Sequence, residues 1–384
     1  MFLSKKTPLV AVDIGSHSIK LVQLAELKDG SFELIHFGMM PLEEESIIEG
    51  AIKKPGQIAE ALTSLVKGEK IQSRYVVASV SGEAVFIKKI KVPQMTEEEL
   101  SEKINEEAEQ YIPFDIDDVA LDFQILGTVN GEAAKPDSSE SKNEDQENQS
   151  SDESNDESDK ENSDEVMMEA LLVAVQRDVI DERTDVLLEA GLKPAIIDLD
   201  VFALMNAARI TNDLTAMGAT ALIDLGDSFT HVNILKNGTI GYTRDIPIGG
   251  GYCSKMLMSK FQVPFSQTHK LKGGHLPDGV EKDEVLKIIV QGYKKVLEEV
   301  QKSFEYFSTI SNTQVERILL TGGGSLIHGM DGFFSDFLKV PVERLDPMQG
   351  ININPKNFDR EMIGELAGLS AVATGLATRR FDYS

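Results

Sequence analysis

The chain has 384 residues, of which 41% are hydrophobic and 27% charged, a balance typical of soluble globular proteins with two or more domains. Its formal net charge is −26. Residues 131–165 hold 14 acidic residues and 3 lysines, and the rest of the chain is acidic as well. Because such a surface repels phosphate backbones, we expect no direct contact with nucleic acid.

Cysteine content and hydropathy favour a reducing compartment and exclude a membrane span. Cys253 is the only cysteine, so no intrachain disulfide can form, and we expect this side chain to fill a small buried space. The first apolar run, residues 8–14, contains Asp13, and no stretch approaches the ~18 apolar residues that a spanning helix requires. We therefore expect a cytoplasmic protein that reaches a membrane only through its partners.

The N-terminal residues predict a β-meander followed by a helix. Residues 9–16 form an apolar run that ends in a turn signal. Residues 19–24 and 32–37 follow as strands joined by a hairpin turn. Residues 58–66 then carry apolar side chains at helical spacing.

A second unit begins near residue 75. Residues 75–80 and 85–92 read as strands, the second of them alternating and basic on one face. Thr96 and Glu99 have the spacing of a capping box, which predicts the start of a helix there. Pro113 ends that helix.

Strands at 121–126 and 167–175 flank a strongly polar segment. Residues 135–165 contain no Val, Ile, Leu, Met or aromatic residue, so they cannot bury enough apolar surface to offset the entropy of ordering. We expect this acidic insertion (131–165) to be a disordered loop at the tip of a hairpin. A solvated tether and an acidic interaction tail are the two roles that its composition allows.

The rest of the chain alternates between helical and strand patterns, which is typical of an α/β protein. We expect helices at 178–190, 202–210, 252–261, 283–307 and 363–378, and strands at 195–199, after Gly218 and at 317–320.

The strongest signal in the sequence is an internal repeat. Residues 12–22 align with residues 223–233, and both segments run from an apolar strand through Asp, an apolar residue, Gly and small polar residues into a second apolar strand. A single copy would fit an ordinary β-hairpin. Two copies, each opening one half of the chain, favour a pair of matched binding loops.

The residue types in the repeat suit a phosphate clamp. Glycine permits a tight turn whose N–H groups can face an anion, hydroxyls add donors, and a lysine adds positive charge. Asp13 and Asp224 would repel a polyphosphate unless a cation intervenes, so they imply Mg²⁺, held directly or through water. The candidate phosphate-binding residues are Asp13, Gly15, Ser16, His17, Ser18 and Lys20 in the first copy, and Asp224, Gly226, Asp227, Ser228 and Thr230 in the second.

Two further glycine runs are candidates for the same ligand. Gly322, Gly323 and Gly324 follow a strand, and glycines there would let the backbone approach a flat ligand such as a purine. Gly249 and Gly250 precede a helix, whose N-terminus could receive a phosphate. An ordinary glycine-rich turn between strand and helix is the alternative for both runs.

Together these elements resemble the two phosphate motifs and the adenosine motif of the superfamily of actin, hexokinase and the DnaK-type chaperones. The resemblance implies an α/β, actin-like (ribonuclease-H-like, duplicated) two-lobed fold that binds ATP with Mg²⁺. It also places Asp200 where the superfamily orients the attacking water, although Asp200 could equally be a helix cap. Glu299 and Lys302 would contact the adenosine.

Within this superfamily, the chain resembles the PilM family of type IV pilus assembly proteins. The segments that carry the resemblance are 92–100, 107–114, 191–194, 198–204 and 375–379. Departures from that family are the acidic insertion and Lys302, which stands where arginine is more usual. The division protein FtsA ends in a basic amphipathic helix that binds the membrane, and residues 377–384 of this chain show no such pattern.

The resemblance implies four subdomains. Subdomain 1A comprises residues 1–74 with 192–217 and a C-terminal helix at about 362–380, and subdomain 1C, of the FtsA and PilM type, comprises 75–191. Subdomain 2A comprises 218–258 with 316–361, and subdomain 2B comprises 259–315.

The resemblance also implies a function. PilM lies at the cytoplasmic face of the inner membrane and binds the N-terminal tail of the membrane protein PilN, so we expect a PilN-like partner and nucleotide-dependent affinity. Three alternatives stay open: an FtsA-like division filament, a small-molecule kinase of the same superfamily, and a platform that binds ATP without hydrolysing it.

Overall fold

The structure is a computed structural model, and it describes residues 7–128, 166–215 and 218–381. The chain divides into a main unit, which runs to Ala84 and resumes at Asp178, and a smaller unit, Val85–Arg177. The smaller unit is shorter than the predicted 75–191. Strand β7 (Tyr75–Val80) pairs with β2 in the main sheet, and Val186 and Leu187 of α3 (Arg177–Glu189) belong to the main core.

The first sheet of the main unit combines a meander with parallel strands. Its strand order is β11-β7-β2-β3-β4-β17, in which β2, β3 and β4 are antiparallel neighbours and β7 and β11 run parallel to β2. The remaining bounds are β2 (Val10–Ile14), β3 (Ser18–Glu26), β4 (Phe32–Pro41), β11 (Lys193–Leu199) and β17 (Ile351–Asn352).

Helices cover both faces of this first sheet, because side chains alternate along each strand. Val10 and Val12 pack in one core with α1 (Pro55–Gly68) and α3. Leu9 and Ala11 pack in the other with α4 (Asp200–Thr211) and α10 (Ala371–Leu376). Two short pairs complete this lobe: β1 (Thr7–Pro8) with β18 (Arg380–Phe381), and β5 (Ile47–Ile48) with β6 (Ala51–Ile52).

Apart from the extra edge strand β17, the second sheet repeats the topology of the first. Its order is β14-β13-β12-β15-β16, again a three-stranded meander followed by two parallel strands. The internal repeat therefore marks two equivalent hairpins, β2–β3 and β12–β13. The bounds are β12 (Ala219–Leu225), β13 (Thr230–Lys236), β14 (Thr239–Ile246), β15 (Val315–Thr321) and β16 (Val342–Arg344).

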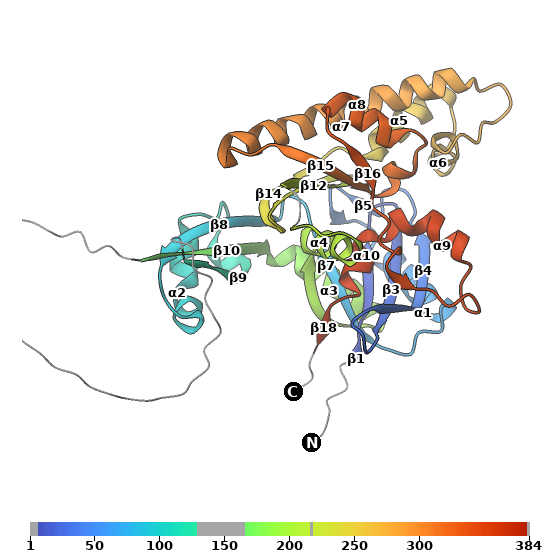
Figure 1. Cartoon of the computed structure of the whole chain (residues 1–384). Coiled ribbons are helices and arrows are strands. Elements are labelled where there is room, and N and C mark those ends of the chain that lie inside the picture. The colour runs from blue at the N-terminus through green and yellow to red at the C-terminus, as the bar shows by residue number, and fades with distance from the viewer. Residues whose placement is uncertain (1–6, 129–165, 216–217, 382–384) are drawn as a thin grey trace, which may run out of the picture. The chain divides into compact units, whose positions relative to one another are not determined.

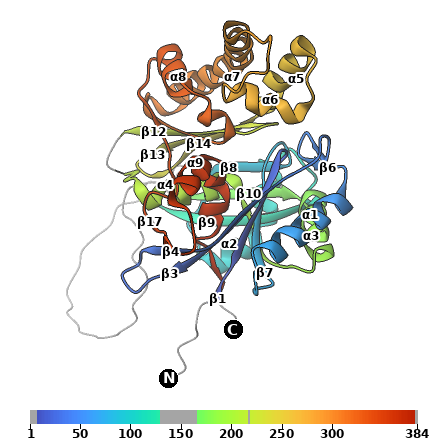
Figure 2. The same cartoon turned by 90° about the vertical axis from the view of Figure 1, so that its right-hand side faces the viewer.

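Four helices cover one face of the second sheet. They are α5 (Gly250–Phe261), α6 (Phe265–Lys272), α7 (Lys282–Ser311) and α8 (Met330–Leu338). The apolar stripe of α7, including Tyr293, Leu297 and Phe307, forms a large part of this core. Figure 1 and Figure 2 both place the second sheet between these helices and the first lobe.

The predicted helix 363–378 is broken in the structure. It consists of α9 (Arg360–Leu366), a 3₁₀ turn (Ala367–Ser370) and α10. The carbonyl of Gly368 accepts from Gly322 N (2.9 Å) and Thr321 Oγ1 (3.1 Å), so it serves a neighbouring loop as an acceptor. These two hydrogen bonds connect the C-terminal segment to the triple-glycine loop.

The smaller unit is a three-stranded sheet with one long helix. Strands β8 (Val85–Pro93), β10 (Met167–Gln176) and β9 (Val119–Thr128) are antiparallel, and a 3₁₀ turn (Ile116–Asp118) precedes β9. The predicted capping box begins α2 (Glu97–Glu109), where Thr96 Oγ1 accepts from Glu99 N and Glu99 Oε2 from Thr96 N. The whole acidic insertion (131–165), which was expected to be disordered, lies outside the described residues.

Candidate functional site

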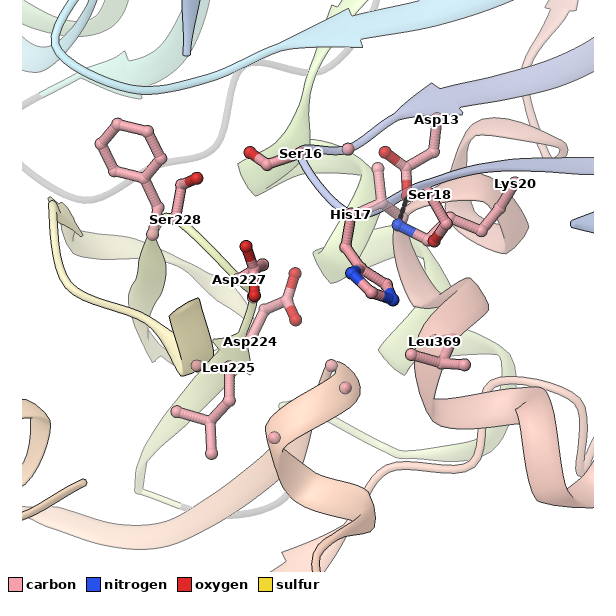
Figure 3. Close-up of a pocket in the computed structure, with 18 of the residues that line it drawn as sticks. Asp13, Ser16, His17, Ser18, Lys20, Asp224, Leu225, Asp227, Ser228 and Leu369 are labelled. Atoms are coloured by element: carbon pink, nitrogen blue, oxygen red, sulfur yellow. Dashed lines mark ion pairs between the residues drawn. The ribbon is translucent and has the colours of Figure 1, made fainter. Parts of the chain in front are cut away.

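A cavity of about 430 Å³ lies between the two lobes of the main unit, within the size range of small-molecule sites. Fifteen of the predicted site residues line it: Asp13, Gly15, Ser16, His17, Ser18, Lys20, Asp200, Asp224, Gly226, Asp227, Ser228, Gly250, Gly322, Gly323 and Gly324. Figure 3 shows the labelled side chains of the two repeat loops facing each other across it.

The first repeat loop turns sharply between β2 and β3. Gly15 N donates to Ser18 O, and strand register places Lys20 opposite Asp13, where Lys20 Nζ lies 3.2 Å from Asp13 Oδ2. A Cβ at Gly15 would lie 2.8 Å from Lys20 Nζ. Glycine therefore leaves the space in which the ammonium group sits, and the loop presents a lysine and two serines to the cavity.

The second repeat loop is held by the N-terminus of α5. Gly250 N donates to Gly226 O and Gly251 N to Asp227 O, both at 2.8 Å. Two of the first N–H groups of α5 therefore bind protein carbonyls. These two N–H groups are therefore not free to receive a phosphate, as was expected of this helix N-terminus: α5 shapes the loop, and the loop faces the cavity. Gly249 packs against that loop, since a Cβ there would lie 2.5 Å from Asp227 O.

The triple-glycine loop lies beside the second carboxylate. Gly322 has φ +83° and a Cβ there would meet Asp224 Oδ1. A Cβ at Gly324 would lie 2.7 Å from Tyr293 Oη, and one at Gly323 would lie 3.1 Å from Leu369. These glycines let the backbone form one wall of the cavity, while the predicted contact with a purine stays a prediction.

Four of the predicted site residues do not line the cavity. The hydroxyl of Thr230 donates to Ile248 O at 2.8 Å, and Gly249 lies behind the second loop. Glu299 pairs with Arg244 (2.8 Å) and Lys302 (2.6 Å). On α7 it is Tyr293, about two turns earlier, that lines the cavity.

Glu299→Gln and Lys302→Ala are therefore expected to leave nucleotide affinity within about threefold of wild type, because a partly exposed ion pair outside the cavity contributes little. Calorimetric titration with MgATP measures this. A tenfold or larger loss in either variant, with unchanged unfolding temperature, would show that the predicted adenosine contacts are made after all.

A cluster of carboxylates surrounds His231, which lines the cavity together with Asp200 and Asp224. His231 Nδ1 is hydrogen-bonded to Asp245 Oδ1 at 2.7 Å, and its Nε2 lies 3.9 Å from Asp200 Oδ2. Burial alone would lower the pKa of His231, but Asp245, Asp200 and Asp224 outweigh it and raise the pKa to about 10. His231 is thus an imidazolium at neutral pH, and it compensates much of the negative charge around it.

Asp200 is not the cap of its helix. The N-cap of α4 is Leu199, which makes no side-chain cap bond, and Asp200 Oδ1 instead accepts from Ser79 Oγ. Burial raises the pKa of Asp200, and His231 opposes that shift. Asp200 thus lines the cavity and does not cap α4, and its role in orienting water stays a prediction.

The second lobe adds side chains that the sequence pattern did not single out. Lys272 on α6 donates to Gly250 O (3.2 Å) and Ser254 Oγ (2.9 Å), and burial lowers its pKa against the opposing charge of Asp227. The His17 ring of the first lobe lies 5.6 Å from the ring of Phe265 on the same helix. The further cavity residues missed from sequence include Ser79, Ser81, Arg183, His231, Thr268, His269 and Tyr293.

Only some of these residues carried a usable sequence signal. Ser79 and Ser81 lie at the carboxyl end of β7, which runs parallel to β2, and the carboxyl ends of parallel strands commonly bind ligands. His231 lies within the second repeat segment, residues 223–233. Lys272, Arg183 and Tyr293 lie on helices in ordinary sequence contexts, so only the tertiary structure brings them to the cavity.

The residues present fit a polyphosphate better than a bare metal ion. No group of three or more His, Cys, Asp or Glu within the described ranges is arranged to hold a metal. His17 Nδ1 is buried and finds no hydrogen-bond partner in the described part of the chain. The two glycine turns, Lys20, Lys272 and this orphaned nitrogen all line the cavity, and they are groups of the kind that bind anions.

Comparison with known proteins agrees with this fold. A solved PilM–PilN type IV pilus biogenesis complex gives a TM-score of 0.78 at 23% identity and covers 97% of this chain and 98% of that chain. The ethanolamine utilization protein EutJ from Carboxydothermus hydrogenoformans gives 0.53 at 13% identity, covering 98% of this chain and 92% of that one. The predicted actin-like two-lobed fold with its inserted subdomain is confirmed.

Curated protein sequences match a smaller part of this chain than the solved structures do. EutJ of Salmonella typhimurium is 22% identical over 136 residues, which span 35% of this chain and 44% of that protein. The family model for the type IV pilus assembly protein PilM, in contrast, matches residues 11–141 and 156–381. Since that match extends over most of the sequence and both lobes, the chain belongs to the PilM family of type IV pilus assembly proteins.

Proposed function

We propose that this protein binds MgATP between its lobes and serves as a cytoplasmic assembly platform for a type IV pilus, at the inner face of the inner membrane. In this proposal it binds the N-terminal tail of a PilN-like membrane protein with an affinity that depends on the nucleotide. The observation that supports nucleotide binding is the pair of matched glycine loops, one from each lobe, facing one cavity. The solved PilM–PilN complex supports the choice of partner.

Each part of the cavity has a role in this proposal. The N–H groups and hydroxyls of the two loops, with Lys20, hold the phosphates, and the triple-glycine wall receives the base. Asp13 and Asp224 hold Mg²⁺ through water, since they form no metal cage by themselves. When bound, Mg²⁺ neutralises phosphate charge that these carboxylates would otherwise repel. Asp200 orients a water molecule if ATP is hydrolysed.

Nucleotide dependence follows from the position of the cavity. A ligand that contacts both lobes stabilises the arrangement of the lobes that it fits best. It can change the affinity for a partner only as far as the ligand binds one arrangement of the lobes more tightly than another.

No helix among the residues that the structure describes is long and apolar enough to cross a membrane. In the proposal, the PilN-like partner therefore provides the membrane attachment.

Asp13→Ala is expected to weaken MgATP binding by about 100-fold, because it removes both the metal contact and the partner of Lys20. Calorimetry is the suitable measurement, since the chain contains no tryptophan for quenching. A PilN-like tail peptide titrated into wild type should bind with different affinity with and without MgATP. In Asp13→Ala that difference should vanish at the same nucleotide concentration.

Asp331→Asn is the matched control. Asp331 also pairs with a cation, Arg344 at 3.4 Å, but on α8 outside the cavity, so this variant should behave as wild type. Full MgATP affinity in Asp13→Ala would contradict the proposed clamp. Equal tail affinity with and without bound MgATP would contradict nucleotide control, and nucleotide-dependent sedimentation of long polymers would favour the FtsA-like filament instead.

A further inference from the structure

Arg183 is a buried cation in the cavity wall that neither repeat loop accounts for. It lies on α3, its exposed fraction is 8%, and it lines the cavity. Its Nη2 donates to Gly50 O at 3.1 Å. Its Nε and Nη1 are buried and find no hydrogen-bond partner within the described residues.

An incompletely bonded guanidinium is costly to bury. Burial lowers the pKa of Arg183, and the charges of Asp200, Glu182 and Asp13 oppose that shift from a distance, without a direct ion pair to Arg183 among the described residues. A guanidinium has five donors in a planar fork, which suits a phosphate group. Bound phosphate would complete the hydrogen bonds that this side chain otherwise lacks.

The surroundings of Arg183 place it away from the base-binding wall. Near the triple-glycine loop, Gly324 and Gly250 lie beside Tyr293, and Gly250 also lies beside Lys272. The charged neighbour of Lys272 is Asp227, whereas those of Arg183 include Asp200 and Asp13. A nucleotide with its base on the glycine wall and its phosphates along the two loops would therefore direct its last phosphate toward the end that holds Asp13 and Arg183.

We propose that Arg183 binds the terminal phosphate of a nucleoside triphosphate and thereby distinguishes the triphosphate from the diphosphate. This inference rests on the proposed nucleotide-binding function and adds a residue from outside the repeat loops. It makes Arg183 a specificity-determining residue.

The position of α3 connects Arg183 with the β5–β6 hairpin and with the point where the chain leaves the smaller unit. The helix begins at Arg177, directly after β10 ends at Gln176, and the boundary between the two units falls at that point. Glu182 accepts from Ile52 N at 3.1 Å while Arg183 binds Gly50 O, so neighbouring residues of α3 hold the β5–β6 hairpin. A terminal phosphate on Arg183 would thus act on the helix through which the chain leaves the smaller unit.

The test compares MgATP and MgADP by calorimetry for wild type, Arg183→Gln and Arg183→Lys. In Arg183→Gln, MgATP affinity is expected to fall about 10- to 100-fold and MgADP affinity by less than about threefold. The MgATP affinity of Arg183→Lys should lie between those of wild type and Arg183→Gln, because lysine keeps the charge but not the planar fork of donors. Arg209→Lys is the matched control: Arg209 Nη2 donates to the carbonyl of another turn glycine, Gly238, at 2.9 Å, and Arg209 does not line the cavity.

Unfolding of each nucleotide-free variant is followed in parallel. If the Arg183→Gln variant does not fold, the comparison of wild type with Arg183→Lys decides the test. Equal losses for MgATP and MgADP would overturn the inference and assign Arg183 to holding the hairpin at Gly50. Unchanged affinity for both would also overturn it. Failure of wild type to bind either nucleotide would instead reject the proposed function, so the two failures are distinguishable.

Discussion

Gly322→Ala is expected to destabilise the protein by about 3–5 kcal/mol, well above the effect of an average substitution. Gly322 has φ +83°, a region in which a Cβ is strained by about 1 kcal/mol. A Cβ there would also lie 2.7 Å from both N and O of Leu225 and would meet Asp224 Oδ1. Because the Leu225 atoms are backbone atoms of a buried central strand, β12 has little freedom to move away.

Gly329→Ala separates the strain of the backbone from the clash. Gly329 has φ +79°, and no atom lies within 4 Å of a Cβ built there, so only the strain of about 1 kcal/mol remains. Urea unfolding of both variants gives the comparison. Similar losses in the two would show that the packing of the triple-glycine loop on β12 is looser than the structure indicates.

The same substitution at Gly322 is expected to reduce MgATP affinity by more than about tenfold. A methyl group there displaces Asp224, and moving a ligand-binding carboxylate out of position can weaken binding as much as removing it does. The test is carried out at a temperature where the variant is folded. Full affinity there would show that Asp224 does not contribute to nucleotide binding.

The duplicated architecture could be predicted from sequence because a short local pattern determines it. Each repeat needs glycine at the turn and apolar residues on both flanking strands, and these requirements are visible in residues 12–22 and 223–233. The equal order of strands in the two sheets follows from that duplication. The capping box at Thr96 and Glu99 could be predicted for the same reason, since its hydrogen bonds lie within one helical turn.

Residues brought to the cavity by tertiary packing could not be predicted in this way. Glu299 and Lys302 satisfy the spacing that the resemblance implies, but α7 meets the cavity at Tyr293, about two turns earlier. Lys272 enters because α6 packs beside the N-terminus of α5, and Arg183 enters because α3 packs on the first sheet. Helix packing distances of this kind have no local signature in sequence.

The helix predicted at 363–378 shows a related limit. Its pattern is helical throughout, yet Gly368 O accepts hydrogen bonds from Thr321 and Gly322, and the helix breaks there. Its second part, α10, packs so closely on α4 that a Cβ at Gly375 would meet the backbone of Ala203. A partner distant in sequence thus overrides the local preference.

Asp224→Asn is expected to stabilise the nucleotide-free protein at pH 7.5 by about 2 kcal/mol and at the same time to weaken MgATP binding by more than about tenfold. Burial raises the pKa of Asp224 from 3.8 to about 6, with Asp13 and Asp200 adding to the shift and His231 and Lys20 opposing it. A raised carboxylate pKa means that ionisation opposes folding. The full shift corresponds to about 3 kcal/mol, and water entering the cavity reduces it.

The sign of this effect fixes its dependence on pH. The free-energy cost of ionising Asp224 in the folded state is absent well below pH 3.8, where the carboxyl is protonated in both folded and unfolded chains. This cost grows as the pH rises from 3.8 to about 6, and it is complete above that. The stabilisation by asparagine should therefore fall by roughly half between pH 7.5 and pH 5. Urea unfolding across that range measures it, with Asp336→Asn, an exposed residue of α8, as the variant expected to change little at any pH. The prediction would be contradicted if Asp224→Asn were destabilising at pH 7.5, or if its effect on stability did not vary with pH. The cationic neighbours of Asp224 would then stabilise its carboxylate in the folded state more strongly than burial opposes it. In that case the protein would not trade stability for function at this position.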